Sequence, residues 1–140
     1  MSSDYPADLY AALHGGNEGD EEFYRAVCAG AERVLELGCG SGRILAALVD
    51  QVGELCGVDS SEEALRLARE KLPASVELHR AEMESFDVGG GFERVLIPFN
   101  GIYCLPDLGS VRRTFVQVEK ALAPGGLLVF DGYACDALHE

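Results

Sequence analysis

The hydrophobic positions of the chain gather into short runs that are bounded by Gly, Pro or acidic residues. Near-continuous apolar runs occupy Arg33–Leu37, Glu54–Val58, Phe92–Ile97 and Leu127–Asp131, and polar and apolar residues alternate over Ser75–Arg80. Runs of this length and composition are typical of β-strands, and continuous ones of strands that are buried on both faces. The pattern therefore predicts five strands.

Between these runs, apolar residues recur every three or four positions, which predicts helices. The expected helices begin near Asp20, extend from Arg43 to about Val52, follow a cap at Ser60 or Ser61 and stop at Pro73, and run from Asp107 to about Leu122. Asp20 could cap the first of them. The side chains expected to face inward are Phe23 and Val27 in the first helix, with Tyr24 as a further candidate, and Leu108, Val111, Phe115, Val118 and Leu122 in the last.

Strands that alternate with helices indicate βαβ units, because parallel neighbours need a crossover connection. The fold class predicted is α/β, a doubly wound and mainly parallel five-stranded sheet of order 3-2-1-4-5 with helices on both faces. We expect residues 1–32 to form an N-terminal cap segment and helix, and residues 33–140 to form the core, because 140 residues suffice for one hydrophobic core but not for two.

The acidic balance of the chain bears on its partners. It has 24 acidic and 11 basic residues, a formal net charge of -13. Such a surface repels phosphate backbones and anionic lipids, so neither a nucleic acid nor a membrane is an expected partner. A small-molecule acceptor fits this charge better.

The cysteines carry no spacing signal. The five are scattered with no C-x-x-C pair, so neither a metal site nor a disulfide framework is expected. The N-terminus shows no signal peptide, and no apolar run approaches the roughly 20 residues that span a bilayer. Together these features favour a cytoplasmic location.

The strongest chemical signal is the glycine-rich turn that follows the first predicted strand. Gly38, Gly40 and Gly42 have the spacing G-x-G-x-G, and a helix begins directly afterwards. Glycines permit positive φ and let a ligand approach the backbone closely. A dinucleotide-binding turn would place its third small residue at position 43, which is Arg43 here. A tight strand-to-helix turn without a ligand remains the alternative.

Asp59 strengthens the interpretation as a ligand site. It ends the second predicted strand, 21 residues after Gly38. A carboxylate in that position lies beside the glycine turn and can accept hydrogen bonds from both hydroxyls of a ribose. Taken alone, Asp59 could equally be a helix cap or a loop acid, and only its combination with the turn favours a nucleoside ligand.

The sequence E-L-G-C-G-S-G-R followed by G-V-D-S-S resembles the class I S-adenosylmethionine-dependent methyltransferases. Segments 81–86, 92–100 and 122–129 agree with that family in order and spacing, so the resemblance covers about residues 5–133. It is strongest to the small-molecule N- and O-methyltransferases. The cofactor implied is S-adenosylmethionine.

The resemblance also implies roles for individual residues. Gly38 and Gly40, with Cys39 between them, would meet the amino-acid portion of the cofactor, and Glu36 would order their loop through water or the cofactor's ammonium group. The remaining cofactor contacts implied are Asp59 at the ribose, Ser60 near the adenine edge, Glu82 and the Met83 backbone at the adenine ring, and Phe99 with Asn100 beside the transferred methyl. The family more often has Asp where this chain has Glu82.

No catalytic residue can be assigned from the sequence, because methyl transfer from a sulfonium is a direct displacement in which a general base is optional. The polar candidates near the methyl are Asn100, Tyr103, Tyr10, His14 and Tyr24, and packing or surface placement is the better explanation for each. His79 lies within a predicted strand and is expected to be structural, whereas His139 is near the terminus and is expected to be mobile.

Two other classes of function remain open. One is a module that binds S-adenosylmethionine without turnover. The other is a nicotinamide-dependent dehydrogenase, which Arg43 disfavours. An aminopropyl transferase would have the same fold, but the sequence shows no distinct acidic site for a polyamine. The family sheet has two further strands beyond the fifth, whereas this chain stops about nine residues after Asp131. We therefore expect either a fragment or a homodimer that pairs through the exposed fifth strand.

Overall fold

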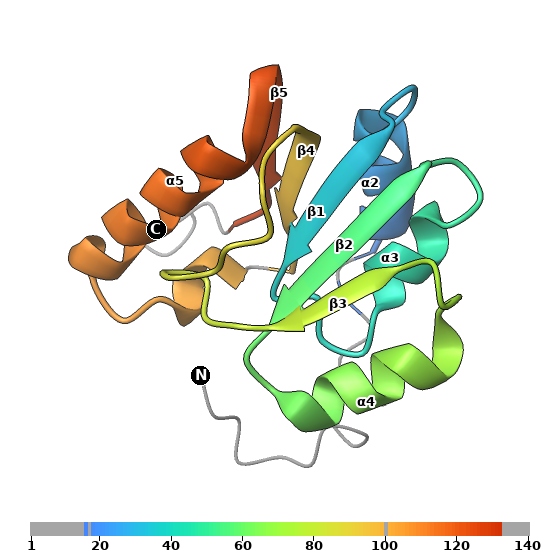
Figure 1. The fold of residues 1–140 in the computed structure, drawn as a ribbon, viewed down its shortest axis with the longest axis horizontal. Coiled ribbons are helices and arrows are strands. Elements are labelled where there is room, and N and C mark those ends of the chain that lie inside the picture. The colour runs from blue at the N-terminus through green and yellow to red at the C-terminus, as the bar shows by residue number, and fades with distance from the viewer. Residues whose placement is uncertain (1–15, 17, 100, 133–140) are drawn as a thin grey trace, which may run out of the picture.

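A five-stranded parallel sheet forms the centre of the protein in the computed structural model, which describes residues 16, 18–99 and 101–132. The strands are β1 (Arg33–Leu37), β2 (Glu54–Asp59), β3 (Glu77–Arg80), β4 (Phe92–Ile97) and β5 (Leu122–Phe130). Their order is β3-β2-β1-β4-β5, and every neighbouring pair is parallel (Figure 1). The predicted fold class and strand order are therefore confirmed.

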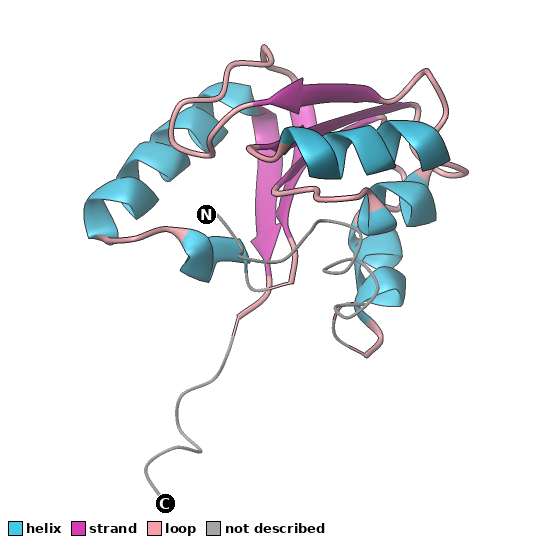
Figure 2. Ribbon diagram, turned by 90° about the horizontal axis from the view of Figure 1, so that it is seen from below, coloured by secondary structure: helices cyan, strands magenta, loops and turns pink. Residues whose placement is uncertain are grey.

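Helices cover both faces of this sheet (Figure 2). They are α2 (Asp20–Val27), α3 (Arg43–Leu48), α4 (Glu62–Lys71), α5 (Leu108–Ala121) and the 3₁₀ turn η1 (Gly101–Cys104). Helices α2, α3 and α4 pack on one face, and α5 lies against the other face beside β4 and β5. No helix in the described part of the chain is long and apolar enough to cross a membrane.

The central strand β1 explains the unbroken apolar runs. Val34 packs into the core shared with α2, α3 and α4, whereas Leu35 and Leu37 point to the α5 side, and all three are fully buried. Successive side chains of a strand alternate between faces, so a strand covered on both faces must be apolar at nearly every position. Among the buried positions of β1, Glu36 is the exception, and it belongs to the candidate site.

Two helix starts are capped by side chains. The Ser61 hydroxyl accepts a hydrogen bond from the Ala64 backbone N–H (3.2 Å), and the Asp107 carboxylate accepts one from the Ser110 N–H (2.7 Å). Of the two predicted caps for α4, the structure thus selects Ser61. Asp20 does not cap α2, because Gly19 occupies that position and Asp20 is the first helical residue.

The predicted inner face of α5 is wrong in part. Leu108 is 74% exposed and Phe115 is 40% exposed. The helix instead buries Ser110 and Thr114 together with Val118, because the Thr114 hydroxyl donates to the Ser110 carbonyl (2.9 Å) and so needs no water. In α2 the fully buried aromatic residue is likewise Tyr24, while Phe23 is 48% exposed.

Several predicted boundaries also move. Helix α3 ends at Leu48 rather than near Val52, and β3 begins at Glu77 rather than at Ser75. The turn predicted at 124–126 lies inside β5, which starts at Leu122 and contains a bulge opposite the segment between Phe92 and Arg94. A bulge accommodates the extra residues without ending the strand.

The division between central and edge strands can be tested with two matched leucine truncations. Leu35→Ala on β1 removes a fully buried side chain and should lower the free energy of unfolding by about 2–5 kcal/mol. Leu127→Ala on β5, where the side chain is 53% exposed, should change it by far less. Urea unfolding followed by circular dichroism measures both, and equal losses would contradict the described burial.

Candidate functional site

The strand order of the sheet reverses at the carboxyl end of β1. From β1 the chain runs outward to β2 and β3 and then crosses back to β4 on the other side of β1. The connections after β1 and β4 therefore leave toward opposite faces of the sheet, and ligands of open α/β sheets bind where this reversal occurs. Four segments meet around this end of the sheet, namely 38–42, 59–61, 81–83 and, after β4, residues 98–99 and 101.

The segment after β1 is built on left-handed glycines. Gly38, Gly40 and Gly42 have φ of 70°, 56° and 88°, a region that other residues rarely adopt. The backbone N–H groups of Gly38 and Cys39 both donate to the Val58 carbonyl (2.7 and 3.0 Å). The glycine turn therefore remains hydrogen-bonded to the end of β2 and does not move as a free loop.

The glycines differ in what surrounds them. Among the described residues, no heavy atom beyond its two chain neighbours lies within 4 Å of the point where a Cβ would stand on Gly40, so its backbone borders open space. At Gly38 the same point lies 2.9 Å from Cε of Met83. The Met83 methyl group also lies 3.8 Å from the Cβ point of Gly101, so this side chain extends between the turn after β1 and the segment after β4.

Asp59 joins two of the segments through its carboxylate. Oδ2 accepts a hydrogen bond from the Gly40 N–H and Oδ1 accepts one from the Ser61 N–H, each at 2.8 Å. Its backbone carbonyl accepts from the Ala81 N–H at 3.1 Å. Each carboxylate oxygen can accept more than one hydrogen bond, so Asp59 orders the site and still has capacity for ligand hydroxyls.

Glu36 is the buried acid of the site. Its side chain belongs to the strand beneath the glycine turn, and only 3% of the residue is exposed. Burial raises the pKa of Glu36 well above its usual value, the nearby charge of Arg43 lowers it, and that of Asp59 raises it further. Oε1 is buried without a hydrogen-bond partner in the described part of the chain. Such an oxygen favours a cationic or hydrogen-bond-donating ligand group.

Arg43 has a role that the sequence analysis did not identify. Its guanidinium binds the Asp20 carboxylate through two hydrogen bonds (2.8 and 2.6 Å), and the Asp20 side chain is only 7% exposed. This bidentate pair holds the start of α2 against the start of α3, directly behind the glycine turn. No sequence signal points to it, because the two residues are 23 positions apart and belong to different elements.

Burial also decides the role of Tyr24. Its hydroxyl is buried and has no hydrogen-bond partner within the described ranges. Burial raises the pKa of Tyr24, and the carboxylates of Asp131, Glu36 and Asp20 raise it further. Tyr24 is therefore a core residue, and the negative charges of these three carboxylates act on its hydroxyl.

The other predicted site residues differ in how exposed their side chains are to a ligand. The Cys39 thiol points into the core and lies 2.9 Å from the Cβ point of Gly57, so Cys39 can reach a ligand only through its backbone. Ser60 is half-buried, and its carbonyl accepts a hydrogen bond from Arg80 (3.2 Å). Glu82 is exposed.

The segment after β4 contains a strained residue. Phe99 has a φ of 54° and is the one non-glycine residue with positive φ among those described. Backbone strain of this kind collects at functional sites. Tyr103 is 56% exposed, with its hydroxyl 2.9 Å from the Cβ point of Gly132 at the end of β5. The candidates Tyr10, His14, Asn100 and His139 lie outside the described residues.

A family model and several known proteins match this chain. The model of a family described as "Methyltransferase domain" matches residues 34–126. A putative methyltransferase of Bacillus subtilis, YqeM, is 35% identical over 113 residues, which cover 77% of this chain and 45% of that protein. A dTDP-3-amino-3,4,6-trideoxy-alpha-D-glucopyranose N,N-dimethyltransferase of Streptomyces venezuelae is 26% identical over 133 residues, covering 89% and 56% of the two chains.

Solved structures agree in fold. The amino pentose methyltransferase CalS10 of Micromonospora echinaspora, solved with S-adenosylmethionine bound, superposes with a TM-score of 0.77 at 27% identity, covering 96% of this chain and 59% of CalS10. Streptomyces venezuelae DesVI gives a TM-score of 0.78 at 25% identity, with coverage of 94% and 59%. The chain spans about half the length of the curated relatives it matches.

The burial of Glu36 predicts a pH dependence of stability. A raised pKa means that the folded chain binds the proton more tightly than the unfolded chain does. The free energy of unfolding therefore falls as the pH rises from about the ordinary value of 4.5 through the raised pKa. Glu36→Gln removes this contribution, so the variant should gain stability over the native chain as pH increases. Urea unfolding at about pH 5 and about pH 8 measures the change.

The matched control is Glu119→Gln, since Glu119 is exposed on α5. It should leave the pH profile unchanged. Parallel profiles for Glu36→Gln and the native chain would contradict the raised pKa of Glu36.

Proposed function

The chain belongs to the family of methyltransferase-domain proteins, and from this premise we propose that it binds S-adenosylmethionine and supports transfer of the methyl group to a small-molecule acceptor. The observation that carries the proposal is the Asp59 carboxylate bonded to the Gly40 N–H beside open space, above the unpartnered oxygen of Glu36. A ligand with a ribose and an ammonium group would satisfy both acids at once.

The described residues fit this cofactor. Glu36 Oε1 is a buried acceptor that lacks a donor, and the α-ammonium group would provide one. Gly40 offers backbone without a side chain, where the amino-acid portion can lie close. Asp59 would accept from the ribose hydroxyls, as its place at the end of β2 favours.

The other proposed contacts concern the adenine and the methyl group. Ser60, Glu82 and Met83 follow β2 and β3 and would border the adenine, with Glu82 as an acceptor for its amino group. The thioether of Met83 is flexible and apolar, so it can shift to lie against the ring. Phe99 would border the methyl group from the strained segment after β4.

S-adenosylmethionine, when bound, supplies a methyl group already activated on a sulfonium. The protein therefore has to align donor and acceptor and exclude water, and orientation of this kind can contribute roughly 7–11 kcal/mol to lowering a barrier. The hydrogen bonds that tie Gly38, Cys39 and Gly40 to the end of β2 hold the turn in place for this purpose. We assign no general base.

We propose an amino group on a small polar molecule as the first acceptor to examine. The Streptomyces venezuelae relative named above is an amino-sugar N,N-dimethyltransferase by its description, and relatives of Streptomyces fradiae and Saccharopolyspora spinosa carry similar descriptions. A ribosomal RNA methyltransferase of Streptomyces avermitilis also matches, over 28% of its length. The net charge of -13 disfavours RNA for this chain, because phosphates would be repelled.

A cytoplasmic location fits the same proposal, because Cys28, Cys39, Cys56 and Cys104 are all free thiols in the described part of the chain. Association through β5 stays a prediction: β5 is an edge strand with Leu127 and Phe130 about half exposed. A monomer by light scattering at high protein concentration would contradict it.

Cofactor binding can be tested by calorimetric titration with S-adenosylmethionine and, separately, with its demethylated product. Asp59→Ala should weaken both affinities by about 10-fold or more, because hydrogen bonds to a charged group contribute about 1.5–3 kcal/mol. Glu36→Gln should weaken them as well. The matched control is Asp87→Ala, an exposed loop acid whose loss should leave both affinities unchanged.

A folded native chain that binds neither ligand would overturn the proposal, and a well-dispersed NMR spectrum establishes that it is folded. Equal affinities for the native chain and Asp59→Ala would remove Asp59 from the site. Binding without methyl transfer to any amino or hydroxyl acceptor, in a panel followed with isotope-labelled cofactor, would favour a binding module instead.

A further inference from the structure

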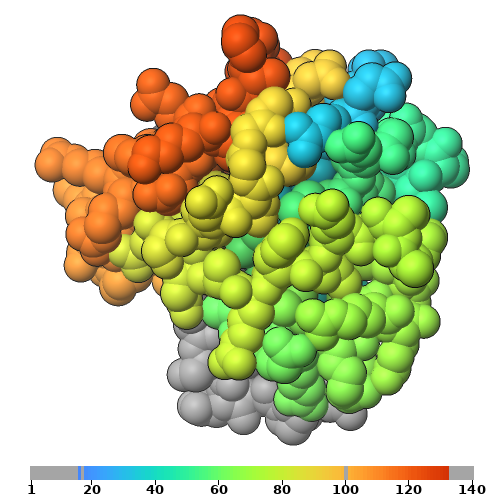
Figure 3. Space-filling model, in the orientation of Figure 1, coloured from blue at the N-terminus to red at the C-terminus, as the bar shows by residue number. Residues whose placement is uncertain are grey.

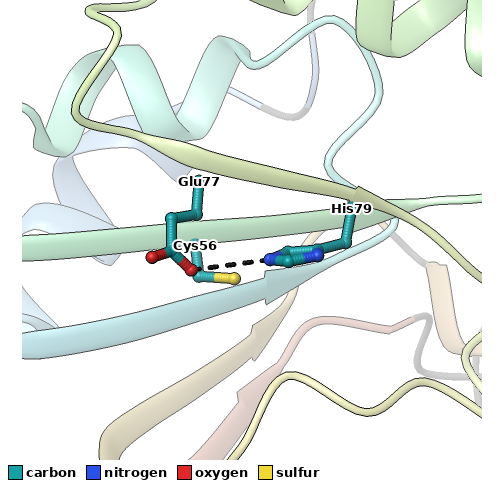
Figure 4. A group of neighbouring side chains, drawn as sticks. All are labelled: Cys56, Glu77 and His79. Atoms are coloured by element: carbon teal, nitrogen blue, oxygen red, sulfur yellow. Dashed lines mark hydrogen bonds and ion pairs between the residues drawn. The ribbon is translucent and has the colours of Figure 1, made fainter.

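A second group of polar side chains lies on the open part of the sheet face that α5 covers elsewhere. Cys56 of β2 is directly opposite Glu77 of β3 in the parallel register, and Val58 is opposite His79. Side chains two positions apart point to the same face of a strand. Cys56, Glu77 and His79 therefore project to one side of the sheet, where Figure 4 shows the sulfur of Cys56 beside the Glu77–His79 pair.

The three potential ligand atoms are close together. Nε2 of His79 is 3.5 Å from Oε2 of Glu77, and these two atoms and Sγ of Cys56 all lie within 4.8 Å of one another. The group contains a thiol, an imidazole and a carboxylate, which are the three kinds of side chain that bind zinc. The members come from two adjacent strands with fixed pairing, so the backbone holds them in place.

We propose that Cys56, Glu77 and His79 bind a single thiophilic divalent cation, with Zn²⁺ as the best match. Bonds of about 2.0–2.3 Å at tetrahedral angles separate ligand atoms by about 3.3–3.8 Å. The Glu77–His79 distance already lies in that range. The sulfur of Cys56 lies within 4.8 Å of both atoms, and rotation of the exposed Glu77 and His79 side chains can bring all three to bonding distance of one ion. Solvent would provide the fourth ligand.

Access and burial suit such an ion. The Glu77 and His79 side chains are 72% and 44% exposed, so they leave a path for the cation and for its water ligand. Cys56 is 3% exposed and forms the floor of the site. Metal binding displaces the proton of the Cys56 thiol, which passes to solvent. The ion would then be held by one soft, buried thiolate and by the two harder side chains of Glu77 and His79 at the surface.

The neighbouring charges allow a cation here. Arg33 on β1 is the positive group that acts on Cys56. Its guanidinium is already bound to Glu54 (2.6 Å) and stacked 4.5 Å from the centre of the Phe92 ring. The carboxylate of Glu77 and a Cys56 thiolate add two negative charges to offset the ion.

The position of the group indicates what the ion would do. β3 is a four-residue strand at the edge of the sheet, and the chain around it lies at the surface in Figure 3. A metal shared by β2 and β3 would cross-link this short edge strand to its neighbour. The site is separate from the proposed methyl transfer, in which these three residues have no part.

Metal binding can be tested on the full 140-residue chain, prepared without an affinity tag and kept reduced with a phosphine. Titration with Co²⁺ alone should produce a thiolate-to-cobalt charge-transfer band and the visible bands of a tetrahedral site, saturating at one ion per chain. Zn²⁺ should displace the cobalt and raise the thermal midpoint of unfolding. His79→Ala and Glu77→Gln change exposed side chains and should each weaken cobalt affinity by about 10-fold or more.

Cys104→Ser is the matched control, because Cys104 is another free thiol outside the group. It should leave the cobalt spectrum unchanged, whereas Cys56→Ser should abolish the charge-transfer band. Absence of that band from the native chain would overturn the proposal, and so would a band that persists at full affinity in both His79→Ala and Glu77→Gln. S-adenosylmethionine affinity should be the same in His79→Ala and the native chain, so failure of either proposal is visible independently of the other.

Discussion

The arrangement of the candidate site depends on the two hydrogen bonds that the carboxylate of Asp59 accepts. Two parallel strands end side by side, and the chain after each must turn without leaving its N–H groups unpaired. Asp59 satisfies one N–H in each turn, at Gly40 and at Ser61, so a single side chain fixes the two turns relative to each other. The donations from Gly38 and Cys39 to the Val58 carbonyl complete the connection. Helices α3 and α4 therefore begin at defined places.

The site carries a cost in stability that the surrounding structure offsets. Glu36 occupies a position in β1 where an apolar residue would pack, and its burial opposes ionisation. Its apolar neighbours Val34, Leu35 and Leu37 are fully buried, and the pair between Arg43 and Asp20 fixes α2 and α3 behind the turn. Apolar packing on both faces of β1 thus offsets the burial of one carboxyl group near the carboxyl end of the strand.

Sequence patterns predicted those features that depend on local chemistry. Apolar runs identified the strands, alternation with helices gave the parallel sheet and its order, and glycine spacing located the turn above which Asp59 lies. The face of α5 was missed because Thr114 satisfies its hydroxyl within its own helix and can be buried in place of Phe115. The Arg43–Asp20 pair and the group at Cys56 were missed because their members meet only in three dimensions. For the second group the required information is the register between β2 and β3, which no spacing in the sequence reveals.

The strand order also constrains how the chain folds. β1 pairs with β2 after one short helix, and β2 pairs with β3 in the same way, so this half of the sheet can assemble from segments that are near in sequence. β4 must instead find β1 across the whole of that half, since Val34 pairs with Arg94 sixty positions later. Closing so long a loop carries an entropic cost that is recovered only when Leu96 and its neighbours become buried. Docking of β4 onto β1 is consequently the step expected to limit the folding rate, and the same step brings the segments after β1 and β4 together.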